Sequence, residues 1–304
     1  MISFSDFIVK QSKVLLENKH HAIFFAMLFA VLPFASWLSV ALVALVTLRK
    51  GAKLGSDLLL PALVIHTVPL LTVVPIESAI INTLITYIPC YVAAISLRKT
   101  MNWQIVCGIL FLLAFFVAMV TQSLFPGFII AQFDQFKTLL SHYHDYQIMV
   151  KTASNEGLSN YEWAQLFFGI QILSAVIITI CSLLFARAMQ AKLFIPGGLA
   201  NELLAFRSGR QALVILLSIS LGAYYDLSVA LNVLPLIISY FLITGFGLVF
   251  FIFARRRQFT VAVLLLLLIM LKPSFVLFAY VIIGVLDSIF NFRLYLPERV
   301  REST

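Results

Sequence analysis

Charged residues are scarce in this chain: they make up 11% of its 304 residues, whereas apolar residues make up 62%. A soluble domain carries about 25% charged and about 45–50% apolar residues. A core of this size could not bury so much apolar surface and still be covered by polar side chains. The composition therefore excludes a soluble globular protein and predicts a protein that crosses the membrane several times.

Cysteines are also few, and the motifs of catalytic sites are missing. Cys90, Cys107 and Cys181 lie in apolar runs without CxxC spacing, so neither a disulfide framework nor a zinc site is predicted. The sequence contains no HExxH, GxSxG or P-loop motif. His142 and His144 of "HYHD" would point to different sides of a helix and are interpreted as polar residues on the protein surface. We therefore expect no enzymatic activity, no cofactor and no metal.

Basic residues outnumber acidic ones, which gives a formal net charge of +8. They fall in short clusters between apolar runs, as in the cytoplasmic loops of membrane proteins, so nucleic-acid binding is not expected. Seven apolar runs separate these clusters, namely 21–48, 57–74, 76–96, 102–123, 161–186, 209–250 and 258–290.

Three of these runs, 21–48, 209–250 and 258–290, are too long for one crossing, because a span needs about 20 residues. Proline or turn residues predict a break in each. The breaks are expected at "LPFAS" (32–36, with Pro33), "GAYYD" (222–226) and "LKPS" (271–274). The predicted fold class is all-α: a polytopic transmembrane helical bundle of 8–10 membrane segments, including short proline-broken hairpins.

The positive-inside rule predicts the orientation. With ten segments and a cytoplasmic N-terminus, all 21 basic residues except Lys137, Lys151 and Lys272 lie on the cytoplasmic side. Both termini are then cytoplasmic, and 1–304 is predicted to be a single integral membrane domain. Its peripheral parts are predicted to be an interfacial amphipathic helix over 1–20, an external loop with an amphipathic helix over 124–160 and a cytoplasmic elbow over 193–208.

Polar residues within apolar runs are the first candidates for function, because an ionisable group in the bilayer costs about 2.5–3.5 kcal/mol. His66 and Glu77 belong to "PALVIHTVPLLTVVPIES" (61–78), whose prolines free backbone carbonyls. Together with Asn232 they are predicted to bind a small molecule. The alternative interpretation is structural: Glu77 caps the helix that follows it, and His66 bonds to a carbonyl.

The segment "LFIPGGLANELLAFRSGR" (193–210) holds the second group of candidates. A helix stop is followed by a carboxylate and two arginines, namely Pro196, Gly197, Gly198, Glu202, Arg207 and Arg210. This order of residues favours a specific cytoplasmic turn between two helices. The alternative is an interfacial helix whose arginines contact lipid phosphates.

Asp287 closes the last apolar run, at a depth where a carboxylate needs a partner. On a straight helix, Arg293 would lie about 600° around the axis from Asp287, so the two would not face each other, whereas Asn291 shares the face of Asp287. We therefore expect Asp287 to pair with Arg207 or Arg210 and to tie the last helix to the elbow. The alternative is a carboxylate solvated at the interface.

Three stretches resemble the YybS-like family of bacterial inner-membrane proteins, a domain of unknown function: "LPFASWLSVALVALVTLRKGAKLG" (32–55), "IPGGLANELLAFRSGR" (195–210) and "YVIIGVLDSIFNFR" (280–293). The resemblance covers nearly the full chain. The family is similar in architecture to the substrate-binding S components of energy-coupling-factor transporters, which implies a binding role in the bacterial inner membrane. The residues that match its motifs are Gly51, Pro196, Gly197, Gly198, Glu202, Arg207, Gly284, Asp287 and Arg293.

Two functions remain open. The first is a small-molecule binding or transport component with a pocket among proline-broken helices, which is a common device in transporters. The second is a non-catalytic protein that assembles with or scaffolds a membrane-protein partner through its basic loops. We prefer the first; its expected partners are the lipid bilayer and a small-molecule ligand.

Overall fold

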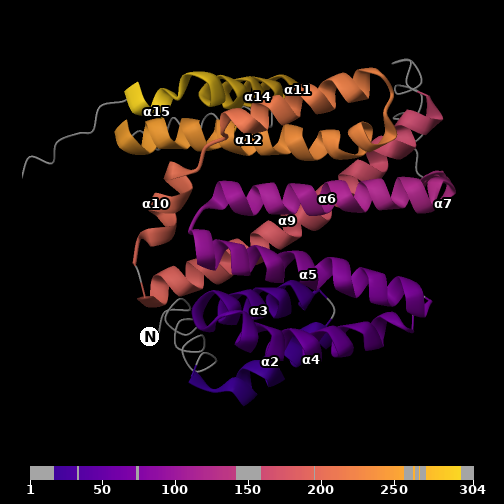
Figure 1. The fold of residues 1–304 in the computed structure, drawn as a ribbon, viewed down its shortest axis with the longest axis vertical. Coiled ribbons are helices and arrows are strands. Elements are labelled where there is room, and N and C mark those ends of the chain that lie inside the picture. Colours follow the sequence, from indigo (N-terminus) through magenta and orange to yellow (C-terminus); the bar gives the residue numbers. More distant parts are fainter. Residues whose placement is uncertain are drawn as a thin grey trace, which may run out of the picture. The chain divides into compact units, whose positions relative to one another are not determined.

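The computed structural model describes residues 17–32, 34–72, 75–141, 159–194, 196–256, 263, 267 and 272–295. Every regular element among these residues is a helix, which confirms the predicted all-α class (Figure 1). The helices are α2 (Lys19–Val31), α3 (Ser36–Lys50), α4 (Ala52–Leu70), α5 (Ile76–Thr100), α6 (Trp103–Leu124), α7 (Pro126–Leu140), α9 (Asn160–Phe194), α10 (Gly198–Ala205), α11 (Arg210–Tyr224), α12 (Ser228–Arg256), α14 (Pro273–Phe290) and α15 (Phe292–Tyr295).

Six of the described helices are long and apolar enough to cross a membrane: α4, α5, α6, α9, α12 and α14. Helices α10 and α11, which are bent by 54° at the break between them, would together make a seventh span. The chain is therefore a multi-pass membrane protein, as its composition predicts.

Two of the three predicted breaks in the long apolar runs are present. The first run is divided between Val31, where α2 ends, and Ser36, where α3 begins. The second is divided between Tyr224 and Ser228, and Asp226 between them adopts φ +57°. Short polar residues such as aspartate tolerate this left-handed conformation, which redirects the chain.

At the third predicted break, the structure describes only the far side, where α14 begins at Pro273. Most of the run before it, and residues 1–16 of the expected interfacial helix, lie outside the described residues. Helix α7 occupies the first part of the predicted 124–160 loop, and the rings of Phe133 and Phe136 pack on Phe167 of α9.

The chain divides into two compact units. Unit 1 comprises residues 1–114 and 173–202, and unit 2 comprises residues 115–172 and 203–304. Helices α6, α9 and α10 contribute residues to both units. A single integral membrane domain over 1–304 stays a prediction.

Unit 1 is built around α3, in which every residue from Ser39 to Leu48 is buried. A helix that is apolar all round is stable only when neighbours surround it, and α2, α4 and α5 pack against it here. Ala22, Ala26 and Ala30 of α2 are buried at intervals of four residues, which allows close helix packing. The Ser39 hydroxyl donates to the Ala26 carbonyl at 2.7 Å.

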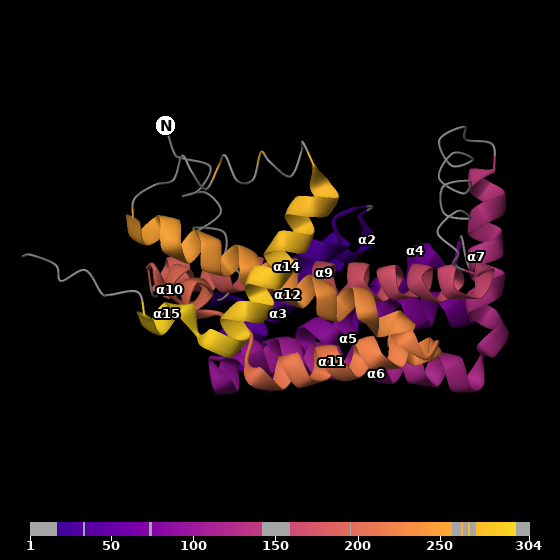
Figure 2. The same cartoon turned by 90° about the horizontal axis from the view of Figure 1, so that it is seen from above.

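Unit 2 contains α11, α12 and α14, which lie together in both views (Figure 2). Glycines bring the backbones of α12 and α14 into contact. A Cβ at Gly245 would lie 1.9 Å from the Tyr280 carbonyl oxygen, and one at Gly284 would lie 2.1 Å from the Phe241 carbonyl oxygen. Gly284, which the sequence singled out as a motif residue, therefore occupies a position that has no room for a side chain.

Candidate functional site

The predicted elbow is a short helix between two breaks. Helix α9 ends at Phe194, and Pro196 and Gly197 form an exposed turn. Gly197 adopts φ +82°, a conformation that costs a glycine little. Helix α10 follows from Gly198, and residues 206–209 are non-helical before α11 begins. The elbow therefore redirects the chain twice, at 196–197 and at 206–209.

The unit 1 end of α10 is anchored by a buried ion pair. Arg187 of α9 donates from Nε to Glu202 Oε2 at 3.2 Å and also contacts Oε1. Trp103 of α6 donates from Nε1 to the same Oε2 at 3.1 Å, and Gln190 accepts from Arg187 at 2.6 Å. Because these groups satisfy one another, this network holds α10 in place rather than offering a free ligand site.

Gly51 is a backbone position. It adopts φ +103° between α3 and α4, and a Cβ there would lie 3.5 Å from the guanidinium carbon of Arg98. Arg98 donates to the carbonyls of Thr47 and Leu48 at 3.2 and 3.1 Å, which satisfies the C-terminal carbonyls of α3. This motif residue therefore supports the turn in which Arg98 caps a helix.

The expected pairing of Asp287 with Arg207 or Arg210 is wrong. Asp287 is fully buried, and its Oδ2 lies 3.5 Å from Nε of Arg293. The two residues meet because the helix does not continue past Phe290. Asn291 adopts a left-handed conformation, φ +49° and ψ +60°, and the reversed chain brings Arg293 back beside Asp287.

The elbow is nevertheless tied to the last helix, by different groups. Arg293 donates from Nη1 to the Leu204 carbonyl of α10. Ser208 shares a hydrogen bond with Ser288 and donates to the Gly284 carbonyl at 3.3 Å. Ser208 and Ser288 are both buried, and sequence reasoning missed them because an uncharged serine in an apolar run is common.

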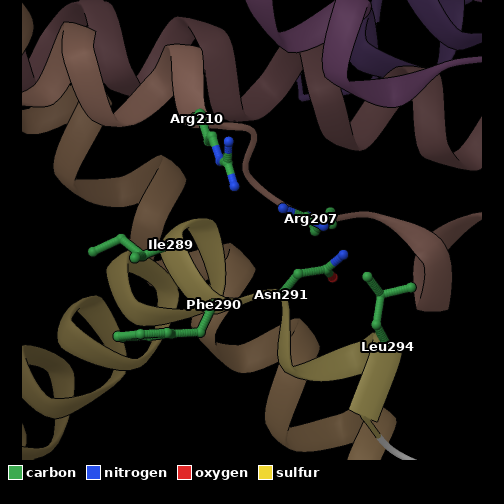
Figure 3. Close-up of a pocket in the computed structure, with 6 residues that line it drawn as sticks. All are labelled: Arg207, Arg210, Ile289, Phe290, Asn291 and Leu294. Atoms are coloured by element: carbon green, nitrogen blue, oxygen red, sulfur yellow. The ribbon is translucent and has the colours of Figure 1, made fainter.

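A pocket of about 590 Å³ opens beside this tie, in unit 2 (Figure 3). The guanidinium groups of Arg207 and Arg210 and the amide of Asn291 turn toward one another. The lining residues are Arg207, Arg210, Ile289, Phe290, Asn291 and Leu294. Sequence analysis singled out three of these six, although it predicted a different role for them.

The positive charge of Arg293 is compensated by the carboxylate of Asp287. Burial lowers the pKa of its guanidinium below the ordinary value, the nearby Asp287 carboxylate opposes that shift, and the positive charge of Arg207 adds to it. Asp287 and Arg293 together are formally neutral, so the arginines that line the pocket set the sign of its charge.

The three predicted binding residues are not brought to one place within a unit. His66 and Glu77 belong to unit 1, whereas Asn232 belongs to unit 2. His66 Nδ1 lies 3.0 Å from the Thr83 hydroxyl, and its ring meets the edge of Tyr87, so it already has partners. Glu77 is in the first turn of α5, and its side chain lies outside the described residues. Binding by His66 and Glu77 stays a prediction.

Asn232 is part of a group of buried amides in unit 2. Its side chain is fully buried, and neither Oδ1 nor Nδ2 has a hydrogen-bond partner. Gln165 of α9 is also fully buried; its Oε1 accepts from Gln122 of α6, but its Nε2 has no partner. Sequence reasoning named Asn232 and missed Gln165, because a glutamine near the end of an apolar run is not unusual.

Two contacts show that α9 and α12 meet at these amides. A Cβ at Gly169 would lie 2.4 Å from the Asn232 carbonyl oxygen, so the two backbones touch there. Gln165 is one turn before Gly169 and shares its face of α9. Tyr161 and Ser228 form a hydrogen bond between the beginnings of the two helices. Gln165 and Asn232 therefore lie at the same helix contact.

Among the described residues, no group of His, Cys, Asp and Glu side chains could hold a metal ion, and "HYHD" lies outside them. The chain matches no protein-family model, no curated protein and no solved structure.

Proposed function

We propose that this multi-pass membrane protein is a binding or transport component for a neutral, polar small molecule. The molecule is held in unit 2 by the amides of Gln165 and Asn232. The observation that carries the proposal is that three buried amide atoms, Nε2 of Gln165 and both polar atoms of Asn232, have no partner in the protein.

Three unpartnered atoms are costly in a membrane. Each buried polar group without a hydrogen bond costs about 1–3 kcal/mol, and lipid chains offer no donor or acceptor in exchange. A proline in α12 leaves a further polar group near these amides. Pro235 has no N–H, so the carbonyl of Leu231 lacks its usual helical donor. A bound molecule that carries its own donors and acceptors would satisfy these groups.

The chemistry of the amides specifies the class of ligand. Asparagine and glutamine side chains donate and accept hydrogen bonds but carry no charge. Gln122, Gln165 and Asn232 are therefore suited to a neutral solute with adjacent donors and acceptors, such as an amide or a polyol. A bare ion is poorly matched to this set, because no carboxylate or basic group belongs to it.

Resemblance to the YybS-like family, and through it to transporter S components, supports a binding role in the bacterial inner membrane. A cytoplasmic location of both termini is part of the proposal. It is supported within unit 1, where Gln190 and Arg98 both donate to the Leu48 carbonyl and Arg49 stacks on Phe194. Two basic residues from two loops, Arg49 and Arg98, thus meet the end of α9 at one end of that unit, in keeping with the positive-inside rule.

The test is mass spectrometry of small molecules that co-purify with the full chain in mild detergent. We expect a neutral polar solute with the wild type and none with Asn232→Leu. Asn82→Leu is the matched control: it makes the same change at an exposed position of α5, and the solute should remain.

The thermal midpoint of the solute-free proteins gives an independent reading. If the amides were an empty structural feature, Asn232→Leu would raise the midpoint, because an apolar side chain removes unsatisfied groups at similar volume. A raised midpoint, together with no co-purified solute in the wild type, would contradict the proposal. A co-purified protein subunit instead of a solute would favour the assembly function.

A further inference from the structure

The pocket in Figure 3 combines positive charge with apolar surface. Two of its six lining residues, Arg207 and Arg210, are basic, and none is acidic. Among the described residues, Asp287 of the same helix end is fully buried and adjoins Arg293. Two guanidinium groups and one amide therefore face the opening with a formal charge of +2.

The pocket lies at the end of a membrane-spanning helix. Ile289 and Phe290 form the last turn of α14, and Asn291 and Leu294 follow it directly. Residues at the end of a span lie at the level of the lipid headgroups. The arginines are therefore placed at the depth of lipid phosphates.

The apolar side chains of the lining are exposed, and their contact with water would cost free energy. Phe290 is 55% exposed and Leu294 is 77% exposed, and Ile289 is exposed beside them. Leu294 lies on the side of Asn291, whereas Ile289 and Phe290 extend from α14 away from the guanidinium groups, so the charged and apolar parts of the lining lie apart (Figure 3). An occupant with one anionic end and one apolar end would satisfy both parts.

We propose that this pocket binds an anionic phospholipid, with the phosphate held by Arg207 and Arg210. Guanidinium groups make charge-assisted, bidentate hydrogen bonds to phosphate oxygens. The Asn291 amide donates to a further headgroup oxygen, and Ile289, Phe290 and Leu294 contact the beginning of the acyl chains. Basic pockets between membrane helices bind anionic headgroups on the same grounds. This site is separate from the neutral-solute site and does not rest on it.

The experiment measures the thermal midpoint of the purified full chain in detergent during titration with dioleoyl phosphatidylglycerol. Dioleoyl phosphatidylcholine, inorganic phosphate and sn-glycerol 3-phosphate are titrated in parallel. We expect a saturable rise with phosphatidylglycerol only, since the headgroup must be anionic and the acyl chains must be present.

Arg207→Gln/Arg210→Gln should weaken phosphatidylglycerol binding by about tenfold or more, because charge-assisted hydrogen bonds to the phosphate are lost. Lys50→Gln/Lys53→Gln is the matched control: it removes two exposed positive charges from unit 1 and should leave the affinity unchanged. Arg210→Gln alone, at the exposed first residue of α11, should weaken binding and keeps the test decisive if the double variant fails to fold.

Three results would overturn the proposal. Equal shifts with phosphatidylglycerol and phosphatidylcholine would show no selection for charge. An equal shift with sn-glycerol 3-phosphate would assign the pocket to a free phosphate compound. An equal loss of affinity in both double variants would show general attraction to anionic lipid rather than a site. Asn232→Leu should retain the phosphatidylglycerol shift, which separates this proposal from that of the solute site.

Discussion

Asn291 is the residue that determines how α14 ends. Its left-handed backbone reverses the chain after Phe290 and brings Arg293 beside Asp287, six residues earlier. Asparagine tolerates this conformation better than most residues, and a single such residue is a common helix end. The same turn places the Asn291 amide in the pocket that Arg207 and Arg210 line, called the arginine pocket below. One backbone angle thus decides both the ion pair and part of the candidate lipid site.

At the scale of the residue, the buried pair gives the first prediction. Arg293→Met should lower the free energy of unfolding by about 3–5 kcal/mol, because it leaves the carboxylate of Asp287 buried without a partner. The double variant Asp287→Leu/Arg293→Met should recover most of that loss, since apolar side chains replace both charges. Thermal or denaturant unfolding in detergent measures both.

The control for this prediction is Lys99→Met, which removes a positive charge from the exposed last turn of α5 and should have little effect. If Arg293→Met and Lys99→Met cost the same, Asp287 does not depend on its neighbour. The pairing would then be an incidental contact.

At the scale of the element, α12 and α14 are packed through glycine. Gly245 and Gly284 each face a carbonyl oxygen of the opposite helix, so the two backbones approach more closely than any side chain would permit. Helices in a membrane gain stability from such close packing, because lipid provides no hydrophobic driving force between them. The close approach also sets where Ser288 meets Ser208 and hence where the elbow attaches.

Gly284→Ala should therefore lower the thermal midpoint by several degrees, because a Cβ would lie 2.1 Å from the Phe241 carbonyl oxygen and 2.9 Å from the Thr244 hydroxyl. Gly108→Ala is the matched control in α6, where a Cβ meets nothing within 4 Å. Alanine is the better helix former, so this control should leave the midpoint unchanged or raise it slightly. Equal effects of the two substitutions would contradict the proposed role of the glycine contact.

Helix α9 shows that clusters of basic residues do not mark where a helix ends. Arg187 belongs to a basic cluster that the sequence assigns to a cytoplasmic loop, yet the helix continues to Phe194 and buries that arginine against Glu202. A buried arginine is tolerated when it is hydrogen-bonded, and here each of its three nitrogens donates to Glu202 or Gln190. The sequence contains both partners but no signal that they meet.

At the scale of the whole molecule, the orientation in the membrane is the main prediction. In a cysteine-free background, Lys151→Cys should react with a membrane-impermeant maleimide in intact cells, because the 124–160 segment is predicted to be external. Lys53→Cys, next to the basic end of unit 1, should react only after the cells are permeabilised. Tags at both termini should likewise be accessible only after the cells are permeabilised.

Labelling of Lys53→Cys in intact cells would reverse the orientation. If the tag were accessible from outside at one terminus only, the chain would cross the membrane an odd number of times rather than an even number. Either result would also move the arginine pocket relative to the cytoplasmic leaflet, where anionic lipids attract basic residues.

The sequence by itself determined the fold class, the breaks in the first two over-long runs and the residues around the elbow. These follow from local chemistry: apolar length requires spanning helices, and turn residues interrupt them. It also singled out Arg207, Arg210 and Asn291, because polar residues at the ends of apolar runs are conspicuous.

Only the tertiary structure decided which of these residues meet. Asp287 adjoins Arg293, Glu202 pairs with Arg187, and Gln165 lies near Asn232 because of a left-handed turn, a continued helix and a glycine contact. The physical reason is that a side chain's partner depends on backbone angles and helix packing elsewhere in the chain. The spacing along one ideal helix does not contain that information.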